Sequence, residues 1–298
     1  MKPISWLFPW LLLAALSLPG AARGGEALRP RLISLYAAHS DILLRLGARR
    51  HLVGVSGQED FARPEWEGEA PPVFSVRDDI EKYLAAEPDL VLARPQHLAG
   101  AARWREALER AGIRVLALQV RRPAELYPYW REIAGLVGRE AAAAEMIAAF
   151  EAALAPYRKT SGRRPGVFLE AIHREVKTFT ADSLPAWLVE LAGGRNVAAG
   201  ASPVRPGVVI ANFGPEALLG VAGEVEVFVA QSGPMNPVSL EELGRREIYQ
   251  TLPAFRQGRV YQIEESLLAR PTPGLLVGLQ QLAAMLAEAK ESAAGQGR

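Results

Sequence analysis

The sequence predicts an α/β protein with two similar parallel-sheet lobes, which are joined by one long helix and enclose a ligand cleft between them. The prediction rests on alternating strand-like and helix-like segments, on a run of strong helix formers near the middle, and on a pattern that returns after that run. The predicted regions are a signal peptide at 1–22, a first lobe at 30–137, a connecting helix at 139–158, a second lobe at 165–290 and a tail at 291–298.

The N-terminal residues have the parts of a secretory signal peptide. Lys2 supplies the positive start, residues 6–18 form an apolar stretch, and Gly20 and Ala22 hold the small-residue positions of a cleavage site. The stretch is short for a membrane span, which takes about 20 residues, and an uncleaved anchor is the alternative. We therefore expect a secreted protein.

Composition limits the compartment and the partners. The chain has no cysteine, so it can form no disulfide and lacks the thiol through which bacterial lipoproteins carry their lipid. We therefore expect a free protein of a Gram-negative periplasm that is not a lipoprotein. Lys plus Arg (34) nearly balance Asp plus Glu (33), so the charge does not point to nucleic acid.

The first lobe alternates short apolar runs, which we predict to be strands, with longer runs that end at Gly or Pro, which we predict to be helices. The predicted strands are 32–35, 52–55, 90–93 and 115–118, and the predicted helices are 41–46, 78–86 and 101–111. Strands that alternate with helices in this way form a parallel sheet covered by helices.

The connecting helix is predicted over residues 139–157, which are rich in Ala, Glu, Met and Leu. Its apolar residues recur at helical spacing and are Met146, Ile147, Phe150 and Leu154. At 1.5 Å per residue, about 19 residues span roughly 28 Å. Residues 160–165 then have the composition of a linker.

Five segments of the first half recur in the same order in the second half, at offsets that grow slowly from 134 residues. The pairs are 35–39 with 169–173, 46–53 with 191–198, 80–84 with 215–219, 89–93 with 226–230, and 114–115 with 259–260. Ligands of open parallel sheets bind beyond the carboxyl ends of the strands, so two such lobes facing each other predict a cleft between them.

Segments spread over residues 30–288 carry a family resemblance, and they are 30–35, 46–48, 52–56, 86–92, 138–140, 191–197 and 258–261. Together they resemble the helical-backbone (class III) periplasmic solute-binding proteins of ABC importers, which are receptors for cobalamin, ferric siderophores, heme and related chelates. The chain departs from that family at 37–41, where Ser, Thr and Glu are common after the first strand, and at 223–226.

The resemblance implies a receptor that is not an enzyme, has no intrinsic cofactor and binds an iron or cobalt chelate. It further implies a monomer in the periplasm that serves the permease dimer of an ABC transporter in the inner membrane. In the family, a glutamate at the tip of each lobe pairs with arginines of the transporter, and Glu81 and Glu216 match these positions. The alternative is that each glutamate only stabilises the first turn of its own helix.

Two histidines lie just past equivalent strand ends, so we expect His39 and His173 to point toward the cleft. Neutral imidazole is the commonest protein ligand of transition metals, and one histidine from each lobe could complete the coordination of a chelated iron or cobalt. The pair could instead bind a bare ion with Glu170 and Asp182 as oxygen donors. A histidine that caps a helix or bonds a loop carbonyl is the remaining alternative.

Arginine and lysine side chains near the same strand ends are candidates for reading carboxylates or phosphates of a chelate. Arg94 interrupts a buried run at the expected cleft edge, whereas Arg174 is better explained as surface charge. The predicted ligand-binding residues are Tyr36, His39, Arg94, Glu170, His173, Lys177 and Phe213, with His39 and His173 as candidate metal ligands.

Three other functions stay open beside chelate import: a receptor for a bare transition-metal ion, a periplasmic metal-dependent enzyme, and a scaffold or sensor that binds a protein through the tip glutamates. Against an enzyme, the sequence has no HExxH or GxSxG motif and no cysteine nucleophile. A bare-ion site needs about four well-placed donors, and the sequence offers only two good ones. An iron chelate or corrinoid therefore ranks first.

Overall fold

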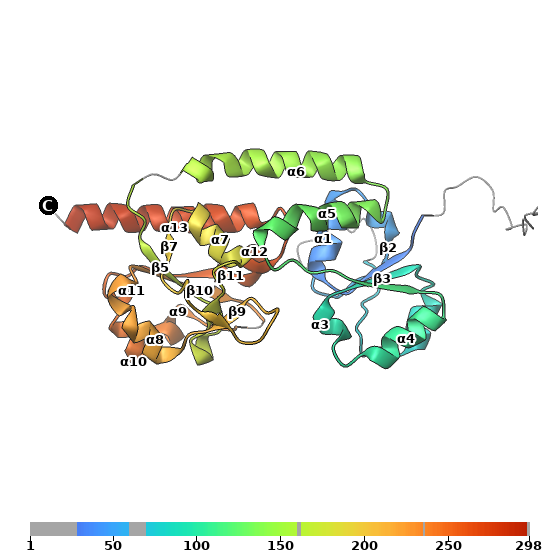
Figure 1. Cartoon of the computed structure of the whole chain (residues 1–298), viewed down its shortest axis with the longest axis horizontal. Coiled ribbons are helices and arrows are strands. Elements are labelled where there is room, and N and C mark those ends of the chain that lie inside the picture. The colour runs from blue at the N-terminus through green and yellow to red at the C-terminus, as the bar shows by residue number, and fades with distance from the viewer. Residues whose placement is uncertain (1–28, 60–69, 160–161, 235, 297–298) are drawn as a thin grey trace, which may run out of the picture.

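Two parallel sheets, one in each lobe, form the centre of the computed structural model, and helices cover them (Figure 1). The structure describes residues 29–59, 70–159, 162–234 and 236–296, with side chains up to residue 291. The predicted signal peptide at 1–22 lies outside the described residues. No helix in the described ranges is both long and apolar enough to cross a membrane.

The first lobe has a four-stranded parallel sheet in the order β2-β1-β3-β4. Its strands are β1 (Leu32–Ser34), β2 (Leu52–Gly54), β3 (Leu90–Ala93) and β4 (Arg114–Ala117). Its helices are α1 (Ala37–Arg45), α2 (Ile80–Ala85), α3 (Pro95–Leu98), α4 (Ala102–Arg110) and α5 (Leu126–Gly135). Strands β1 and β3 are buried throughout, which explains why they are continuous apolar runs and do not alternate.

The second lobe repeats this arrangement in the order β11-β10-β5-β7. Its parallel strands are β5 (Gly166–Glu170), β7 (Arg195–Asn196), β10 (Val227–Ser232) and β11 (Val260–Glu264). Its helices are α7 (Leu184–Leu191), α8 (Gly214–Gly220), α9 (Leu240–Gly244), α10 (Glu247–Gln250), α11 (Pro253–Arg256), α12 (Glu265–Ala269) and α13 (Leu275–Gln296). Matching β1 to β5, β2 to β7, β3 to β10 and β4 to β11 reproduces the repeat read from the sequence.

Short elements complete the chain. A small antiparallel sheet of β6 (Thr178–Phe179), β9 (Ile210–Asn212) and β8 (Ser202–Pro203) lies in the second lobe. The 3₁₀ turns are η1 (Arg49–His51), η3 (Pro123–Glu125), η4 (Ala155–Lys159), η5 (His173–Glu175) and η6 (Ala222–Glu224). The sequence did not predict the three strands of this small sheet, which are only two or three residues long.

The connecting helix α6 (Glu140–Leu154) runs along the top of both lobes beside α5 and α13 (Figure 1). Its buried side chains Ala143, Ile147, Phe150 and Leu154 form one stripe at helical spacing. The last helix, α13, continues through Gln296 into the region predicted as a tail, because most residues there favour helix.

One hydrophobic core extends from the first lobe under these helices into the second lobe, with Leu32, Trp130, Phe150, Leu169 and Leu282 among its members. The indole Nε1 of Trp130, which is fully buried, donates a hydrogen bond of 2.7 Å to the carbonyl of Pro271 in the second lobe. A shared core with a buried polar contact restricts relative motion of the lobes. The predicted architecture of two α/β lobes and one connecting helix is confirmed.

Candidate functional site

The carboxyl ends of the central strands carry the candidate site. β1 leads to Tyr36, β3 to Arg94 and β5 ends at Glu170. In Figure 1, α3 of the first lobe and β9 of the second lobe lie at facing edges. We call Tyr36, Arg94 and His173, which lies in the loop after β5, the interlobe set, because open parallel sheets bind ligands at this edge.

Tyr36 and Arg94 form the contribution of the first lobe. The Arg94 guanidinium lies over the Tyr36 ring, with 4.4 Å between its central carbon and the ring centroid. Its Nε is buried and has no hydrogen-bond partner in the described structure. Burial raises the pKa of Tyr36, while Arg94 and Arg270 lower it and Glu265 raises it. Since Arg270 and Glu265 belong to the second lobe, the lobes meet around Tyr36.

His97 lies beside Arg94 on the short helix α3, where its Nδ1 accepts a 3.3 Å hydrogen bond from the Arg94 backbone N–H. Burial, and secondly the charge of Arg94, lowers the pKa of His97. Nothing in the local sequence pattern shows that α3 turns this histidine toward Arg94.

His39 does not face the second lobe, so its predicted role as a ligand-binding residue and metal ligand is wrong. The side chain is fully buried. Its ring lies 5.3 Å from that of Tyr36 and 5.8 Å from that of Tyr129, and neither ring nitrogen has a hydrogen-bond partner in the described structure. Burial lowers its pKa to about 3. The chain enters α1 at Ala37, directly after β1, and this places His39 on the inner face of the helix.

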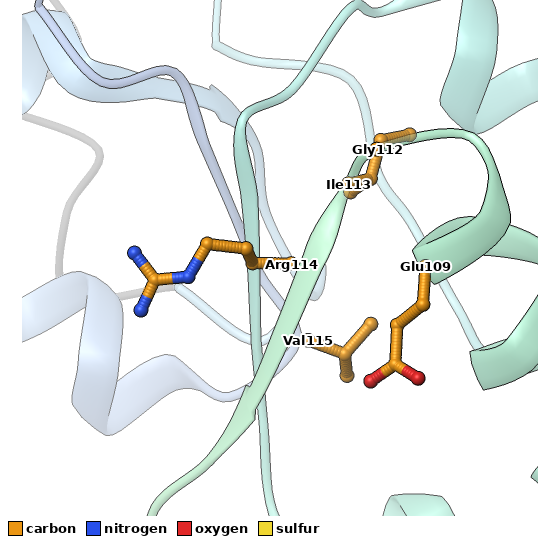
Figure 2. A pocket seen from close by; sticks show the side chains of 5 residues that line it. All are labelled: Glu109, Gly112, Ile113, Arg114 and Val115. Carbon is orange, nitrogen blue, oxygen red and sulfur yellow. The ribbon is translucent and has the colours of Figure 1, made fainter. Parts of the chain in front are cut away.

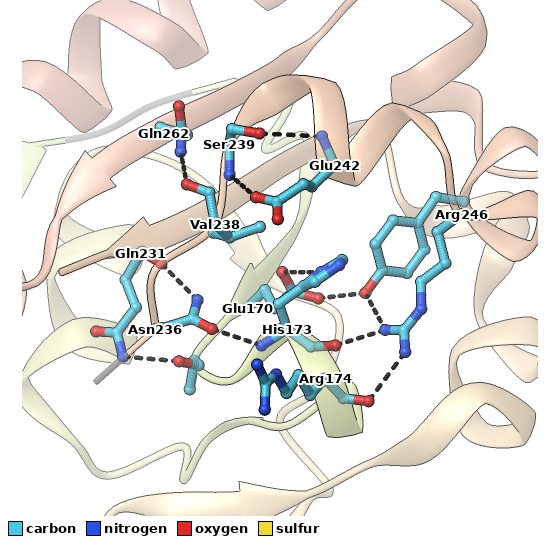
Figure 3. Close-up of polar contacts among 12 residues, drawn as sticks. Glu170, His173, Arg174, Gln231, Asn236, Val238, Ser239, Glu242, Arg246 and Gln262 are labelled. Atoms are coloured by element: carbon cyan, nitrogen blue, oxygen red, sulfur yellow. Dashed lines mark hydrogen bonds and ion pairs between the residues drawn. The ribbon is translucent and has the colours of Figure 1, made fainter. Parts of the chain in front are cut away.

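Glu170 and His173 do lie together in the second lobe (Figure 3). Nδ1 of His173 is 3.2 Å from Oε2 of Glu170, and the other carboxylate oxygen bonds the hydroxyl of Tyr249. Glu170 is completely buried, whereas the His173 side chain remains 18% exposed. Glu170 therefore supports its neighbour and cannot contact a ligand itself, which corrects its predicted role.

A second set of hydrogen bonds fixes the loop that carries His173. The backbone N–H of His173 donates to Oδ1 of Asn236 over 2.8 Å, and Gln231 donates to the carbonyl of Ala171 over 2.8 Å. The Arg246 guanidinium donates to the carbonyls of His173 and Arg174 (Figure 3). These partners come from segments far along the chain, so no local sequence signal could reveal them.

The loop also holds a left-handed backbone at Val176, with φ of 49°. A β-branched residue in this region is strained, and such strain is kept only where the surroundings hold it in place. Here Val176 is fully buried and its carbonyl accepts a 3.1 Å hydrogen bond from the backbone of Gly214. The loop after β5 is thus held in one conformation.

Two further predicted residues have other partners. Lys177 forms a 2.5 Å ion pair with Glu175. Phe213 is partly buried and packs on Phe168 in the second core cluster, with 5.4 Å between ring centroids, so its predicted contact with ligand is not supported.

The donors proposed for a bare ion do not gather. Asp182 pairs with Arg122 of the first lobe over 2.9 Å, Glu170 is enclosed, and His39 is in the core. Within the described ranges, no group of three or more His, Asp or Glu side chains could hold a metal ion. The structure therefore gives no support to a bare-ion site.

Two shallow surface hollows lie away from the interlobe set. The first, of about 290 Å³, is lined by Glu109, Gly112, Ile113, Arg114 and Val115 around the start of β4 (Figure 2). The second, of about 280 Å³, lies between η4 and α7 beside Trp187. Neither contains a residue from a strand's carboxyl end, so we do not place the site in them.

Glu81 and Glu216 occupy the first turns of α2 and α8, which precede the equivalent strands β3 and β10. Both glutamates are exposed. One turn further on, each helix exposes a leucine, Leu84 at 44% and Leu219 at 51%. Residues three apart are neighbours on a helix surface, so each lobe displays the same acidic and apolar pair.

The fold and the repeat agree with comparisons to known proteins. Residues 32–267 match the periplasmic binding protein family, and the chain belongs to it. The chain is 25% identical to the vitamin B12-binding protein of Vibrio vulnificus over 291 residues, which cover 95% of this chain and 96% of that protein. It is 22% identical to the uncharacterized ABC transporter substrate-binding lipoprotein YvrC of Bacillus subtilis over 262 residues, covering 85% and 78% of the two chains.

Solved structures share the same two-lobed fold. A possible iron-binding, periplasmic solute-binding protein of Staphylococcus epidermidis superposes with a TM-score of 0.73 at 20% identity, covering 86% of this chain and 98% of that one. The periplasmic heme-binding protein RhuT of Roseiflexus superposes with a TM-score of 0.67 at 21% identity, covering 88% and 99%.

The Bacillus relative corrects one prediction about location. We expected a protein that is not a lipoprotein, but that relative is a substrate-binding lipoprotein, so this prediction is contradicted and is withdrawn. It rested on the absence of cysteine from these 298 residues, a single compositional feature. A place outside the cytoplasm is supported by the family and by both relatives.

Proposed function

We propose that this protein captures a metal chelate, either an iron complex, heme or a corrinoid, and delivers it to an ABC importer. The observation that carries the proposal is the interlobe set on a periplasmic binding protein fold, with Tyr36 and Arg94 on one lobe and His173 on the other. The names of relatives and neighbours, which include receptors of vitamin B12 and heme, favour this ligand class.

The partner we propose is the permease dimer of an inner-membrane ABC transporter, served by a monomeric receptor. The support is the paired surface of Glu81 with Leu84 and Glu216 with Leu219. Equivalent surfaces on both lobes suit a partner that has two-fold symmetry, since each lobe can then meet the same patch of one subunit. The glutamates supply charge recognition and the leucines supply apolar area.

We propose no catalytic activity and no intrinsic cofactor. The alternative of a metal-dependent enzyme would need a cluster of metal-binding side chains, and the described residues contain none. A receptor for a bare ion would need the same cluster. Binding a complete chelate needs only contacts to its edges and at most one donor to its metal, which the interlobe set can provide.

The test is ligand binding by the mature protein. We would purify it from its native compartment, record its absorption spectrum and metal content, and then titrate hemin, aquacobalamin and the ferric siderophore ferrioxamine B, following thermal stabilisation and tryptophan fluorescence. Stoichiometric binding of one chelate supports the proposal. Binding of free divalent ions with no response to any of the chelates would overturn it in favour of the bare-ion receptor.

A further inference from the structure

A buried carboxylate lies at the carboxyl ends of β1 and β2 in the first lobe. Glu59 is 6% exposed, and its Oε1 accepts hydrogen bonds from the backbone N–H of Ser56 over 3.1 Å and from the Ser56 hydroxyl over 2.8 Å. The Ser40 hydroxyl lies 2.9 Å from the same carboxylate oxygen and 2.8 Å from the hydroxyl of Ser34. The chain segments that follow β1 and β2 therefore meet in a connected set of oxygen atoms.

The negative charge of Glu59 is not balanced by a side chain. Its Oε2 is buried without a hydrogen-bond partner, and no lysine, arginine or histidine among the described residues forms an ion pair with it. Asp41, a neighbouring buried carboxylate, does have such a partner, Arg45, over 2.9 Å. The first turn of α1, which carries Ser40, supplies a partial positive charge of only about one half. Because an uncompensated buried carboxylate is costly, this set of oxygens favours a bound cation.

We propose that Glu59, Ser34, Ser40 and Ser56 hold an alkali cation, sodium or potassium, as a structural ion that is separate from the captured ligand. Carboxylate and other oxygen atoms are the donors that hard cations prefer. One carboxylate balances a single positive charge, and the affinity of calcium sites rises with the number of charged ligands, so this donor set fits a monovalent ion. A set without nitrogen or sulfur donors does not suit a transition metal.

The proposed ion site is connected to the interlobe set. The Ser34 hydroxyl donates a 3.0 Å hydrogen bond to the carbonyl of Tyr36. The carbonyl of Gln58, next to Glu59, accepts a 3.5 Å hydrogen bond from Arg270 of the second lobe. A bound ion therefore fixes the loop after β2 between the end of β1 and the second lobe. This role does not depend on which ligand the protein captures.

The dependence of stability on the alkali ion is the direct test. The mature protein is dialysed into choline chloride and titrated separately with sodium, potassium and calcium chloride at constant ionic strength. Sodium or potassium should raise the melting temperature by at least about 2 °C over choline. Isothermal titration calorimetry with thallium(I) nitrate, a salt of a cation that mimics alkali ions, should show one site and gives a measurement that does not involve unfolding.

The variants locate the ion. Glu59→Gln keeps the shape of the side chain without its charge and should lose both the stabilisation and the thallium(I) binding. Ser40→Ala removes one oxygen donor, should weaken thallium(I) binding by at least about tenfold, and serves as the second variant if Glu59→Gln does not fold. The matched control is Asp41→Asn, a change at the buried carboxylate that already has a cationic partner, and it should keep both responses.

Three results would overturn the proposal. The first is equal stability in sodium, potassium and choline with no thallium(I) binding. The second is a response that survives in Glu59→Gln, or in Ser40→Ala with unchanged affinity. The third is stabilisation by calcium alone, which would contradict the assignment of a monovalent ion. None of these results bears on chelate capture, so the proposed function stands or fails by its own titrations.

Discussion

His39 should make the stability of this protein depend on pH, because its imidazole is fully buried in the folded chain. The ordinary pKa of histidine is about 6.5, and burial lowers that of His39 to about 3. Main-chain groups at Leu118 and Leu92 oppose this shift only in part. Between these two values the unfolded chain binds a proton that the folded chain does not, so unfolding takes up a proton and the free energy of unfolding falls as the pH falls.

The size of the effect follows from the two pKa values. Full stability is present above pH 6.5, and the loss approaches about 1.4 kcal/mol per pH unit below it until pH 3. Between pH 7 and pH 5, this one side chain should cost the folded state about 2 kcal/mol. That is a large share of a typical total stability of about 5–15 kcal/mol.

The assay is urea unfolding at pH 7 and pH 5, followed by fluorescence, on the wild type and on His39→Phe. Phenylalanine keeps an aromatic ring against Tyr36 and Tyr129 but cannot take a proton. The drop in stability between the two pH values should be smaller in the variant by about 2 kcal/mol. Comparing one variant with itself at two pH values removes any constant packing cost of the larger ring.

A buried histidine elsewhere supplies the control. His51 is also buried, with Nδ1 2.9 Å from the carbonyl of Pro30, and His51→Gln leaves His39 in place. This control should therefore retain the pH slope that His39 contributes. An unchanged pH slope in His39→Phe would refute the reasoning, because it would mean that the imidazole titrates alike in the folded and unfolded chains.

Three further predictions follow from the contacts described. Arg94→Gln should weaken binding of the captured chelate by about 1.5–3 kcal/mol, the usual contribution of a hydrogen bond to a charged group, as measured by fluorescence titration, and should leave the melting temperature unchanged. Glu81→Ala combined with Glu216→Ala should leave the affinity for the captured chelate intact but slow its import into cells, and normal uptake would contradict this prediction. Trp130→Phe should lower the free energy of unfolding by about 1–3 kcal/mol, because the carbonyl of Pro271 loses its buried donor.

The fold could be predicted because each strand and helix has a local sequence pattern, and because these patterns recur in the second half of the chain. The strand predicted at 90–93 coincides with β3, and its residues are all buried, so a continuous apolar run was a sound guide. The repeat between the halves predicted two similar lobes, and equivalent strands do follow the same order in both sheets. In each lobe, helices cover a parallel sheet, so segments with similar sequences take equivalent positions in the two sheets.

The site could be predicted only where a side chain directly follows a strand. Arg94 lies at the edge that the sequence indicated, because β3 ends at Ala93. The repeat aligns His39 with His173, so we predicted the same position at the cleft for both. The chain after β1 forms helix α1, which buries His39, whereas the chain after β5 forms the 3₁₀ turn that carries His173. Tyr249, the partner of Glu170, lies 79 residues further along the chain, so only the fold brings it near.

The two lobes share a fold but present different chemistry at matching strand ends, and this difference bears on the ligand. After β1 and β3 the first lobe offers an aromatic ring and a cation, Tyr36 and Arg94. After β5 the second lobe offers an imidazole held by a buried carboxylate. A bare metal ion would need only the imidazole of the second lobe. A chelate with negative charge but no accessible metal would need only the cation of the first lobe. The proposed chelates would suit both surfaces, because they can carry negative charge for Arg94 to bind and a metal for the imidazole of His173 to bind.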